Sequence, residues 1–257
     1  MSLPVFKAES SVSHLRTGEQ YVLTGPEARH AATVQRLGPG EMLDVVDGDG
    51  HRLTCGVVSA QKDQVVLTVE SLETTEHRAP EITLVQALAK GDRDLQAVES
   101  CTELGVDHVI AWQADRSVAR FRAERKDKQL EKWRNTIITA AKQSRRSLWP
   151  VLGAPVDTRA LVRLVQDSPQ TQWLILHEQA QRTLTSVLRG SDQEGGISPG
   201  GQVGIVVGPE GGISEAELDQ LTAAGARPVL LGPEVLRSST AGAAAVVLIN
   251  AFTGRWA

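Results

Sequence analysis

Two glycine-bearing loops near the carboxyl end of the chain have the composition of a ligand-binding site. One reads GPEGG at Gly208–Gly212, and the other reads LGPEVLRSST at Leu231–Thr240. Each follows a short apolar run, Val203–Val207 or Val229–Leu231, and leads into a predicted helix. Continuous apolar runs of this length are typical of strands buried on both faces, and open α/β sheets bind ligands at the carboxyl ends of their strands. The loops therefore predict a crevice at one edge of a parallel sheet.

The composition of the loops restricts the kind of ligand. Neither loop has the G-x-G-x-x-G or G-x-x-x-x-G-K-[ST] pattern of a phosphate cradle, and neither contains a lysine. Glycines without side chains allow the backbone to approach a ligand closely. On the loops alone, the alternative interpretation is a pair of tight strand-to-helix turns that serve only packing.

Strands and helices alternate from Ile82 onward, which predicts a parallel sheet with helices on both faces. One helix is expected to begin after an N-cap at Asp92, and another after a capping box formed by Ser214 and Glu217. A final helix is expected over Ser238–Phe252. A flexible surface loop is expected at Gly190–Gly201. The remaining predicted elements are the strands Ile82–Leu88, Val109–Trp112 and Trp173–Leu176 and a long helix that includes Leu130–Ser144.

The first 74 residues are typical of a small antiparallel β-barrel. Three β-branched runs predict strands at Met42–Val46, Leu53–Val58 and Val65–Val69, and Asp47–Gly50 is a hairpin signal between the first two. The polar stretch Glu73–Pro80 predicts a linker. We therefore expect a β domain over residues 1–74 and an α/β domain over residues 80–257.

Composition and charge narrow the class of protein further. Cys55 and Cys101 are isolated in sequence, which predicts buried thiols in a reducing, cytoplasmic compartment and no metal site. No long apolar run predicts a membrane span, and the first residues do not predict a secretory signal. The net charge is −4, yet Arg116–Arg146 carries 11 Lys/Arg against three acidic residues. This stretch is either a solvated helix face or a surface that attracts a polyanion.

Seven parts of the chain carry a recognisable pattern: Gly208–Ser214 with Glu217, Leu231–Thr240, Ala87–Arg93, Thr102–Val106, Arg116–Val118, Trp133–Arg146, and the positions His30, Val34, Arg36 and Gly40. Together they resemble one known family, the ribosomal RNA small-subunit methyltransferase E family of knotted (SPOUT) methyltransferases. The resemblance covers nearly the whole chain. Three positions depart from the family pattern: Ser100 replaces a usual Lys, Glu234 a usual Arg and Ser239 a usual Glu.

The resemblance implies a PUA-like RNA-binding barrel over residues 1–74, followed by a trefoil-knotted parallel-sheet domain over residues 80–257. It implies a homodimer that uses S-adenosyl-L-methionine (SAM) to methylate N3 of a uridine in 16S rRNA. The expected partner is 16S rRNA or the small ribosomal subunit. The loop after Leu176 is expected to form a third wall of the cofactor site. The residues assigned to the cofactor are Leu176, His177, Glu178, Gly208, Pro209, Gly211, Gly212, Leu231, Gly232, Leu236, Ser238 and Thr240.

The implied reaction defines the catalytic candidates. N3 of uracil carries a proton, so the site needs a base or a cation that stabilises the uracil anion. Arg237 is the first candidate for that cation, with an ion pair to Glu234 as its structural alternative. Glu210 is a weaker catalytic candidate that could instead orient a loop amide. No residue is a clear general base, although His177 could serve.

RNA contacts are expected from basic residues on loops after strands, at the end of the basic helix and in the barrel. These residues are Arg36, Lys90, Arg93, Arg116, Arg145 and Arg146. Two further functions stay open. The chain could be another SPOUT enzyme that acts on a ribose 2′-oxygen or a tRNA base. It could also be a non-enzymatic RNA-binding assembly factor, an interpretation that the departures at Ser100, Glu234 and Ser239 keep open.

Overall fold

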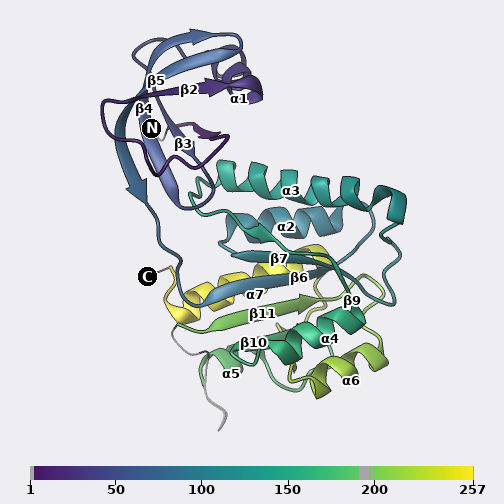
Figure 1. Cartoon of the computed structure of the whole chain (residues 1–257). Helices are drawn as coiled ribbons and strands as arrows, with labels where there is room; N and C mark the ends of the chain where they lie inside the picture. Colours follow the sequence, from purple (N-terminus) through teal and green to yellow (C-terminus); the bar gives the residue numbers. More distant parts are fainter. Residues whose placement is uncertain (1–2, 191–196, 198–199, 257) are drawn as a thin grey trace. The chain divides into compact units, whose positions relative to one another are not determined.

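The computed structural model describes residues 3–190, 197 and 200–256 (Figure 1). Most of the surface loop predicted at 190–201 lies outside these residues. Contacts divide the chain into two compact units, Met1–His77 with Ala141–Trp149, and Arg78–Ala140 with Pro150–Ala257. The segment 141–149 belongs to the first unit because Lys142 Nζ lies 2.7 Å from both carboxylate oxygens of Glu27.

The first unit is a five-stranded sheet in the order β1-β3-β4-β5-β2. The predicted strands are confirmed as β3 (Met42–Val46), β4 (His51–Gln61) and β5 (Gln64–Thr74), whereas β1 (Val5–Lys7) and β2 (Gln20–Thr24) were not predicted. The expected antiparallel pairing is wrong at one place, because β1 pairs with β3 in parallel. A short helix α1 (Gly25–Arg29) continues into a π-helical turn, η1 (His30–Val34).

The hairpin predicted between β3 and β4 is confirmed, and Asp47 organises it. Its carboxylate accepts hydrogen bonds from the backbone N–H groups of Val12, Asp49 and His51 and contacts His51 Nδ1 at 2.8 Å. Burial alone would raise the pKa of Asp47, but these hydrogen bonds outweigh burial and lower the pKa. Gly48 and Gly50 adopt φ values of 91° and 102°, which side chains disfavour.

The second unit contains a sheet in which every paired strand is parallel, in the order β12-β10-β11-β6-β7-β8, with β9 also paired to β7. The parallel α/β sheet expected for this domain is therefore confirmed, while its knotted threading stays a prediction. The strands are β6 (Glu81–Ala87), β7 (His108–Gln113), β8 (Val151–Leu152), β9 (Val156–Asp157), β10 (Thr171–Leu176), β11 (Gln202–Val207) and β12 (Arg227–Val229).

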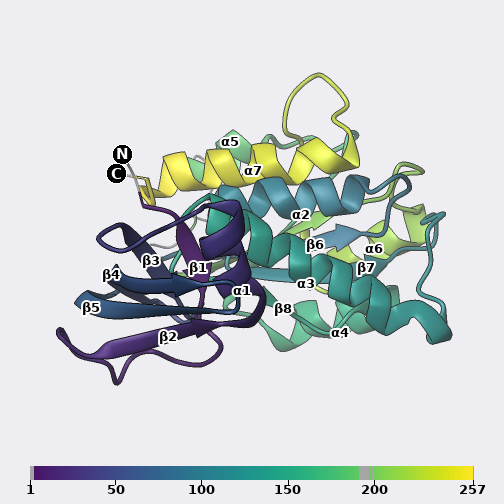
Figure 2. The same cartoon turned by 90° about the horizontal axis from the view of Figure 1, so that it is seen from above.

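Helices cover both faces of this sheet (Figures 1 and 2). Alternate strand residues separate two cores: Ile82 and Ile205 pack with the first group of helices, and Val85 and Val206 pack with the second. The first group contains α2 (Arg93–Glu103), α3 (Lys126–Gln143), α5 (Leu184–Leu188) and α7 (Ser238–Thr253), and the second contains α4 (Thr158–Asp167) and α6 (Glu215–Ala223). None of the helices in the described part of the chain is both long and apolar enough to cross a membrane.

Two local predictions need correction. Asp92 is the N-cap of α2, but it adopts a left-handed φ of 56° and its side chain makes no capping hydrogen bond. The carboxylate of Asp94 instead accepts hydrogen bonds from the N–H groups of Ala89 and Leu95. Strand β12 ends at Val229, so the apolar residues Leu230 and Leu231 belong to the loop that follows it. Helices α4 and α5 were not predicted.

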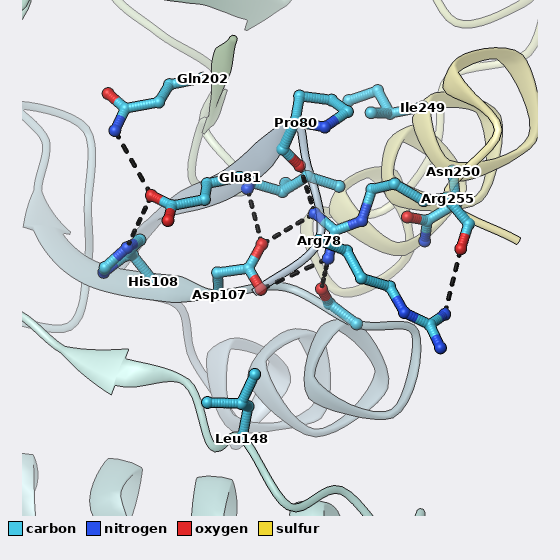
Figure 3. A network of polar contacts seen from close by, with 12 residues as sticks. Arg78, Pro80, Glu81, Asp107, His108, Leu148, Gln202, Ile249, Asn250 and Arg255 are labelled. Atoms are coloured by element: carbon cyan, nitrogen blue, oxygen red, sulfur yellow. Dashed lines mark hydrogen bonds and ion pairs between the residues drawn. The ribbon is translucent and has the colours of Figure 1, made fainter. Parts of the chain in front are cut away.

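A buried ion pair joins Arg255, which follows α7, to Asp107, which precedes β7 (Figure 3). The guanidinium of Arg255 lies 2.8 Å from Asp107 Oδ2, and the two side chains are 5% and 6% exposed. Arg255 also donates to the carbonyl oxygens of Pro80 and Gly105, and Asp107 also accepts from the N–H of Ile82. The end of α7 is thus joined to β6 and to the loop that precedes β7.

We expect Arg255→Ala to lower the free energy of unfolding by about 3–5 kcal/mol, because it leaves the buried Asp107 carboxylate without its charge partner. The matched control is Arg134→Ala, which removes an exposed pair with Glu131 whose side chains are 53% and 52% exposed. That loss should be about 0–1 kcal/mol. Urea unfolding measures both values, and equal losses would contradict the assignment.

Candidate functional site

A cavity of about 380 Å³ opens at the carboxyl ends of β10, β11 and β12. Three loops form most of its lining: one follows β10, one follows β11, and one follows β12 and leads into α7. Arg116, from the loop after β7, also lines it. The predicted crevice is present, but β11 and β12 are not neighbours, because β10 lies between them. The loop after β10, which the sequence placed as a third wall, therefore lies between the other two.

The structure brings together nearly all residues that the sequence assigned to the cofactor. Arg237 and Thr240 are not among the lining residues, whereas Glu210 and Arg116 are. The assigned residues that line the cavity are Leu176, His177, Glu178, Gly208, Pro209, Gly211, Gly212, Leu231, Gly232, Leu236 and Ser238.

Glycine occupies these positions of the cavity for different physical reasons. A Cβ on Gly208 would lie 2.7 Å from Ile213 Cγ1, and a Cβ on Gly211 would lie 3.1 Å from Arg116 Cβ. Gly212 has a φ of 73°. At Gly232 a Cβ would meet only Glu234 Oε2, at 3.9 Å. The loop after β11 therefore needs glycine for its own packing, while Gly232 leaves open space beside the cavity.

Ser238 supplies a polar atom that a ligand could satisfy. It is the first residue of α7, lines the cavity and is 7% exposed. Its Oγ has no hydrogen-bond partner within the described part of the chain. Buried hydroxyls are nearly always hydrogen-bonded, so this one favours a polar ligand in the cavity.

Glu210 joins the loop after β11 to the loop after β6. Its Oε1 accepts hydrogen bonds from the N–H of Lys90 at 3.1 Å and from Arg93 Nη1 at 3.2 Å. The carboxylate therefore orients a loop amide, which was the alternative interpretation of this residue. The guanidinium of Arg93 is held by the same carboxylate, while Lys90 is exposed.

A second carboxylate, Glu217, is fully buried beneath the loop after β11. Its Oε2 accepts from the N–H and Oγ of Ser214, which completes the predicted capping box of α6. Its Oε1 accepts from the N–H of Asp115 at 2.8 Å and from Thr158 Oγ1 at 2.7 Å. One side chain thus connects three segments: the loop after β11, the loop after β7 and the start of α4. The sequence predicted the cap but gave no signal for the other two partners.

The charged residues that line the cavity are mainly acidic. Arg116 is its only Arg or Lys among the described residues, and Arg116 Nη1 donates to the carbonyl oxygen of Gly211 at 3.2 Å. His177 Nδ1 accepts from the N–H of Gln179, so this ring stabilises its own loop. The acidic lining residues are Glu178, Glu210, Glu215 and Glu234. An excess of carboxylates favours a ligand that carries positive charge.

The other residues predicted to contact RNA lie in the first unit. Arg36 and Arg145 are exposed and adopt positive φ values of 56° and 58°. Arg146 is half-buried, and its Nε donates to the carbonyl oxygen of Leu148. Arg146 is therefore engaged within its own unit.

The possible metal ligands and the two cysteines of the described residues lie as follows. No group of three or more His, Cys, Asp or Glu side chains among them is arranged to hold a metal ion. Cys55 and Cys101 are free and buried, and burial raises the pKa of each thiol to about 12. Neither cysteine is a reactive thiolate.

Comparison with known proteins defines the class first. Residues 76–250 match the model of an RNA methyltransferase domain, and residues 23–70 match that of an RNA methyltransferase PUA domain. The chain is thus an RNA methyltransferase-type protein with an added PUA domain.

Individual relatives then define the family. The Ribosomal RNA small subunit methyltransferase E of Mycobacterium bovis is 40% identical over 242 residues, which cover 93% of this chain and 89% of the relative. The crystal structure of the Neisseria gonorrhoeae protein of that name, bound to S-adenosyl methionine, has a TM-score of 0.83 at 27% identity and covers 97% of this chain and 98% of its own. A Legionella pneumophila protein in complex with SAM has a TM-score of 0.84 at 27% identity, over 98% of each chain. The chain belongs to the ribosomal RNA small subunit methyltransferase E family.

We expect Glu217→Ala to destabilise the second unit by at least about 2 kcal/mol, because the N–H groups of Ser214 and Asp115 lose their buried acceptor. Exchange of amide hydrogens in residues 211–217 should accelerate as well. Glu215→Ala, which removes an exposed carboxylate two positions away, is the control and should cost less than about 1 kcal/mol. Denaturant unfolding and hydrogen exchange test both variants, and similar behaviour of the two would exclude Glu217 as a connecting residue.

Proposed function

We propose that this protein transfers a methyl group from SAM to N3 of a uridine in 16S rRNA. The observation that carries the proposal is the cavity at the ends of β10, β11 and β12, which is lined by the two loops that bear the family's sequence motifs. The names of its relatives, and the SAM bound in two related structures, support the same reaction and cofactor.

The cavity fits SAM in size and in chemistry. Its volume of about 380 Å³ is within the range usual for small-molecule sites. The carboxylates of Glu178, Glu215 and Glu234 favour the sulfonium and ammonium charges of the cofactor, and Arg116 favours its carboxylate. The unpartnered Oγ of Ser238 can bond to a polar group of the ligand. When bound, SAM supplies an activated methyl group, and the protein positions the acceptor and excludes water.

Arg237 is our candidate for the cation that stabilises the uracil anion. It is exposed at the N-cap of α7, next to the cavity-lining residues Leu236 and Ser238. Its guanidinium makes no hydrogen bond or ion pair with other described residues, so the pair with Glu234 considered as its alternative is not formed. A free guanidinium can bond to a uracil carbonyl oxygen as N3 loses its proton.

For Glu210 we propose a positioning role. Both of its contacts, to Lys90 and Arg93, hold the loop after β6 against the loop after β11. This contact orients Lys90 at the edge of the site, where its ammonium can meet an RNA phosphate.

Assembly and domain roles complete the proposal. The β domain over residues 1–74 would bind RNA, and the α/β domain over residues 80–257 would perform catalysis. A homodimer is supported by α7, where Ala251 and Phe252 are exposed and Ala244 is half-buried, a small apolar face suited to a second copy. Light scattering that finds only a monomer under active conditions would exclude the dimer.

The two free thiols favour action in the cytoplasm.

The modified nucleoside is the direct test of the reaction. Purified protein is incubated with unmodified 16S rRNA and isotopically labelled SAM, and the nucleosides are identified by mass spectrometry. Label in 3-methyluridine is expected. Label in a 2′-O-methyl nucleoside would redirect the proposal to the ribose, and absence of any label with a folded protein would refute it.

We expect Arg237→Ala to lower turnover on rRNA by about 10²-fold, because the lost interaction forms mainly in the transition state. The dissociation constant for SAM, measured by calorimetry, should stay close to that of the unchanged protein. Arg237→Lys keeps the charge without the planar fork and should recover part of the turnover. Near-normal turnover of Arg237→Ala would remove this residue from the mechanism.

A further inference from the structure

Five exposed cations lie together between β7 and the second turn of α3. None of their side chains makes a hydrogen bond or ion pair with another described residue. They are Arg122, Arg125, Lys126, Lys128 and Lys132. We call Arg122–Lys132 the basic segment, because these five cations outnumber its three acidic residues, Glu124, Asp127 and Glu131.

Most other cations of this part of the sequence are already engaged. Three arginines donate to backbone carbonyl oxygens: Arg116 to that of Gly211, Arg120 to that of Asp115 and Arg146 to that of Leu148. Two more cations form ion pairs, Arg134 with Glu131 and Lys142 with Glu27. Arg145 is exposed as well, but it belongs to the first unit. Within Arg116–Arg146, the unengaged cations of the second unit therefore lie in the basic segment.

The topology places the start of the basic segment at the carboxyl ends of the strands, the same end of the sheet that holds the cavity. The strands are parallel, so the loop after β7 emerges at the same edge as the loops after β10, β11 and β12. Arg116, in this loop, lines the cavity. Helix α3 then returns the chain toward the opposite edge, because β8 pairs with His108 and Val109 at the beginning of β7 (Figure 1). The first turns of α3 are thus the turns nearest to the cavity.

Charge at this edge is divided between its two sides. Exposed Glu178, Glu215 and Glu234 follow β10, β11 and β12, which form one side of the strand order. Exposed Lys90 and the basic segment follow β6 and β7 on the other side, where exposed cations outnumber the exposed acidic residues Asp92, Asp115, Glu124, Asp127 and Glu131. Arg237 is an exception on the acidic side. A polyanion that approaches the cavity is attracted to the side of β6 and β7 and repelled from the acidic side.

We propose that the basic segment is the surface on which the methyltransferase domain holds the phosphate backbone of its RNA substrate, an inference that rests on the proposed function. Lys and Arg side chains that contact phosphates fix the position of a nucleic acid without reading its sequence, and they release counterions on binding. In this arrangement the backbone crosses the start of α3 while the target base reaches the cavity.

The test compares two double variants of the full-length protein, Arg125→Ala/Lys128→Ala in the basic segment and Arg159→Ala/Arg163→Ala on α4. The control pair is also exposed, carries the same charge and lies on the other face of the same sheet. Binding to unmodified 16S rRNA is measured at several salt concentrations. The first variant should bind about tenfold more weakly at about 0.1 M salt, and its plot of log K against log salt should be shallower by about 1.4, the value for two lost phosphate contacts. The control should match the unchanged protein.

Two further measurements separate the possible failures. Thermal unfolding and calorimetry with SAM should give the same values for both variants and the unchanged protein. Equal weakening of both variants would indicate a general effect of net charge and would overturn the proposal. If the first variant binds RNA as tightly as the unsubstituted protein, the proposal is also overturned. The proposed function would still stand in that case if the unsubstituted protein methylates rRNA. An unchanged protein that neither binds nor methylates rRNA would refute the proposed function, and the surface with it.

Discussion

The parallel direction of the strands in the larger sheet is the constraint on which the site depends. Because the paired strands run the same way, the loops after β6, β7, β10, β11 and β12 all emerge at one edge, and residues far apart in sequence meet there. Arg116 and Gly211 come into contact across this edge, as do Lys90 and Glu210. An antiparallel strand at any of these positions would send its loop to the opposite edge.

Side chains that are not free to bind substrate hold these loops in place. The buried carboxylate of Glu217 accepts from residues of three segments, and Glu210 joins two loops at the surface. Glycines at positions 208 and 211 let the loop pack against Ile213 and Arg116 without a Cβ in the way. A carboxylate in a low-dielectric interior needs several donors, so Glu217 makes the loops after β7 and β11 depend on each other.

In our proposal, electrostatics directs the two substrates to different sides of the same end of the sheet. Carboxylates at the ends of β10, β11 and β12 suit a sulfonium cofactor, and unengaged cations after β6 and β7 suit RNA phosphates. The chain as a whole carries a net charge of −4, so local arrangement rather than total charge explains how an acidic protein can bind a polyanion.

The sequence alone determined the parallel α/β class, most strands of both sheets, the capping box of α6 and the loops around the cavity, because these follow from local patterns of apolar, glycine and capping residues. It did not determine that β10 lies between β11 and β12, or that β1 pairs in parallel. It also could not show that Glu210 and Glu217 bind residues about 100 positions away. Such pairings depend on which strands become neighbours, and only the assembled tertiary structure sets that order, because no local pattern encodes the partner of a long-range contact.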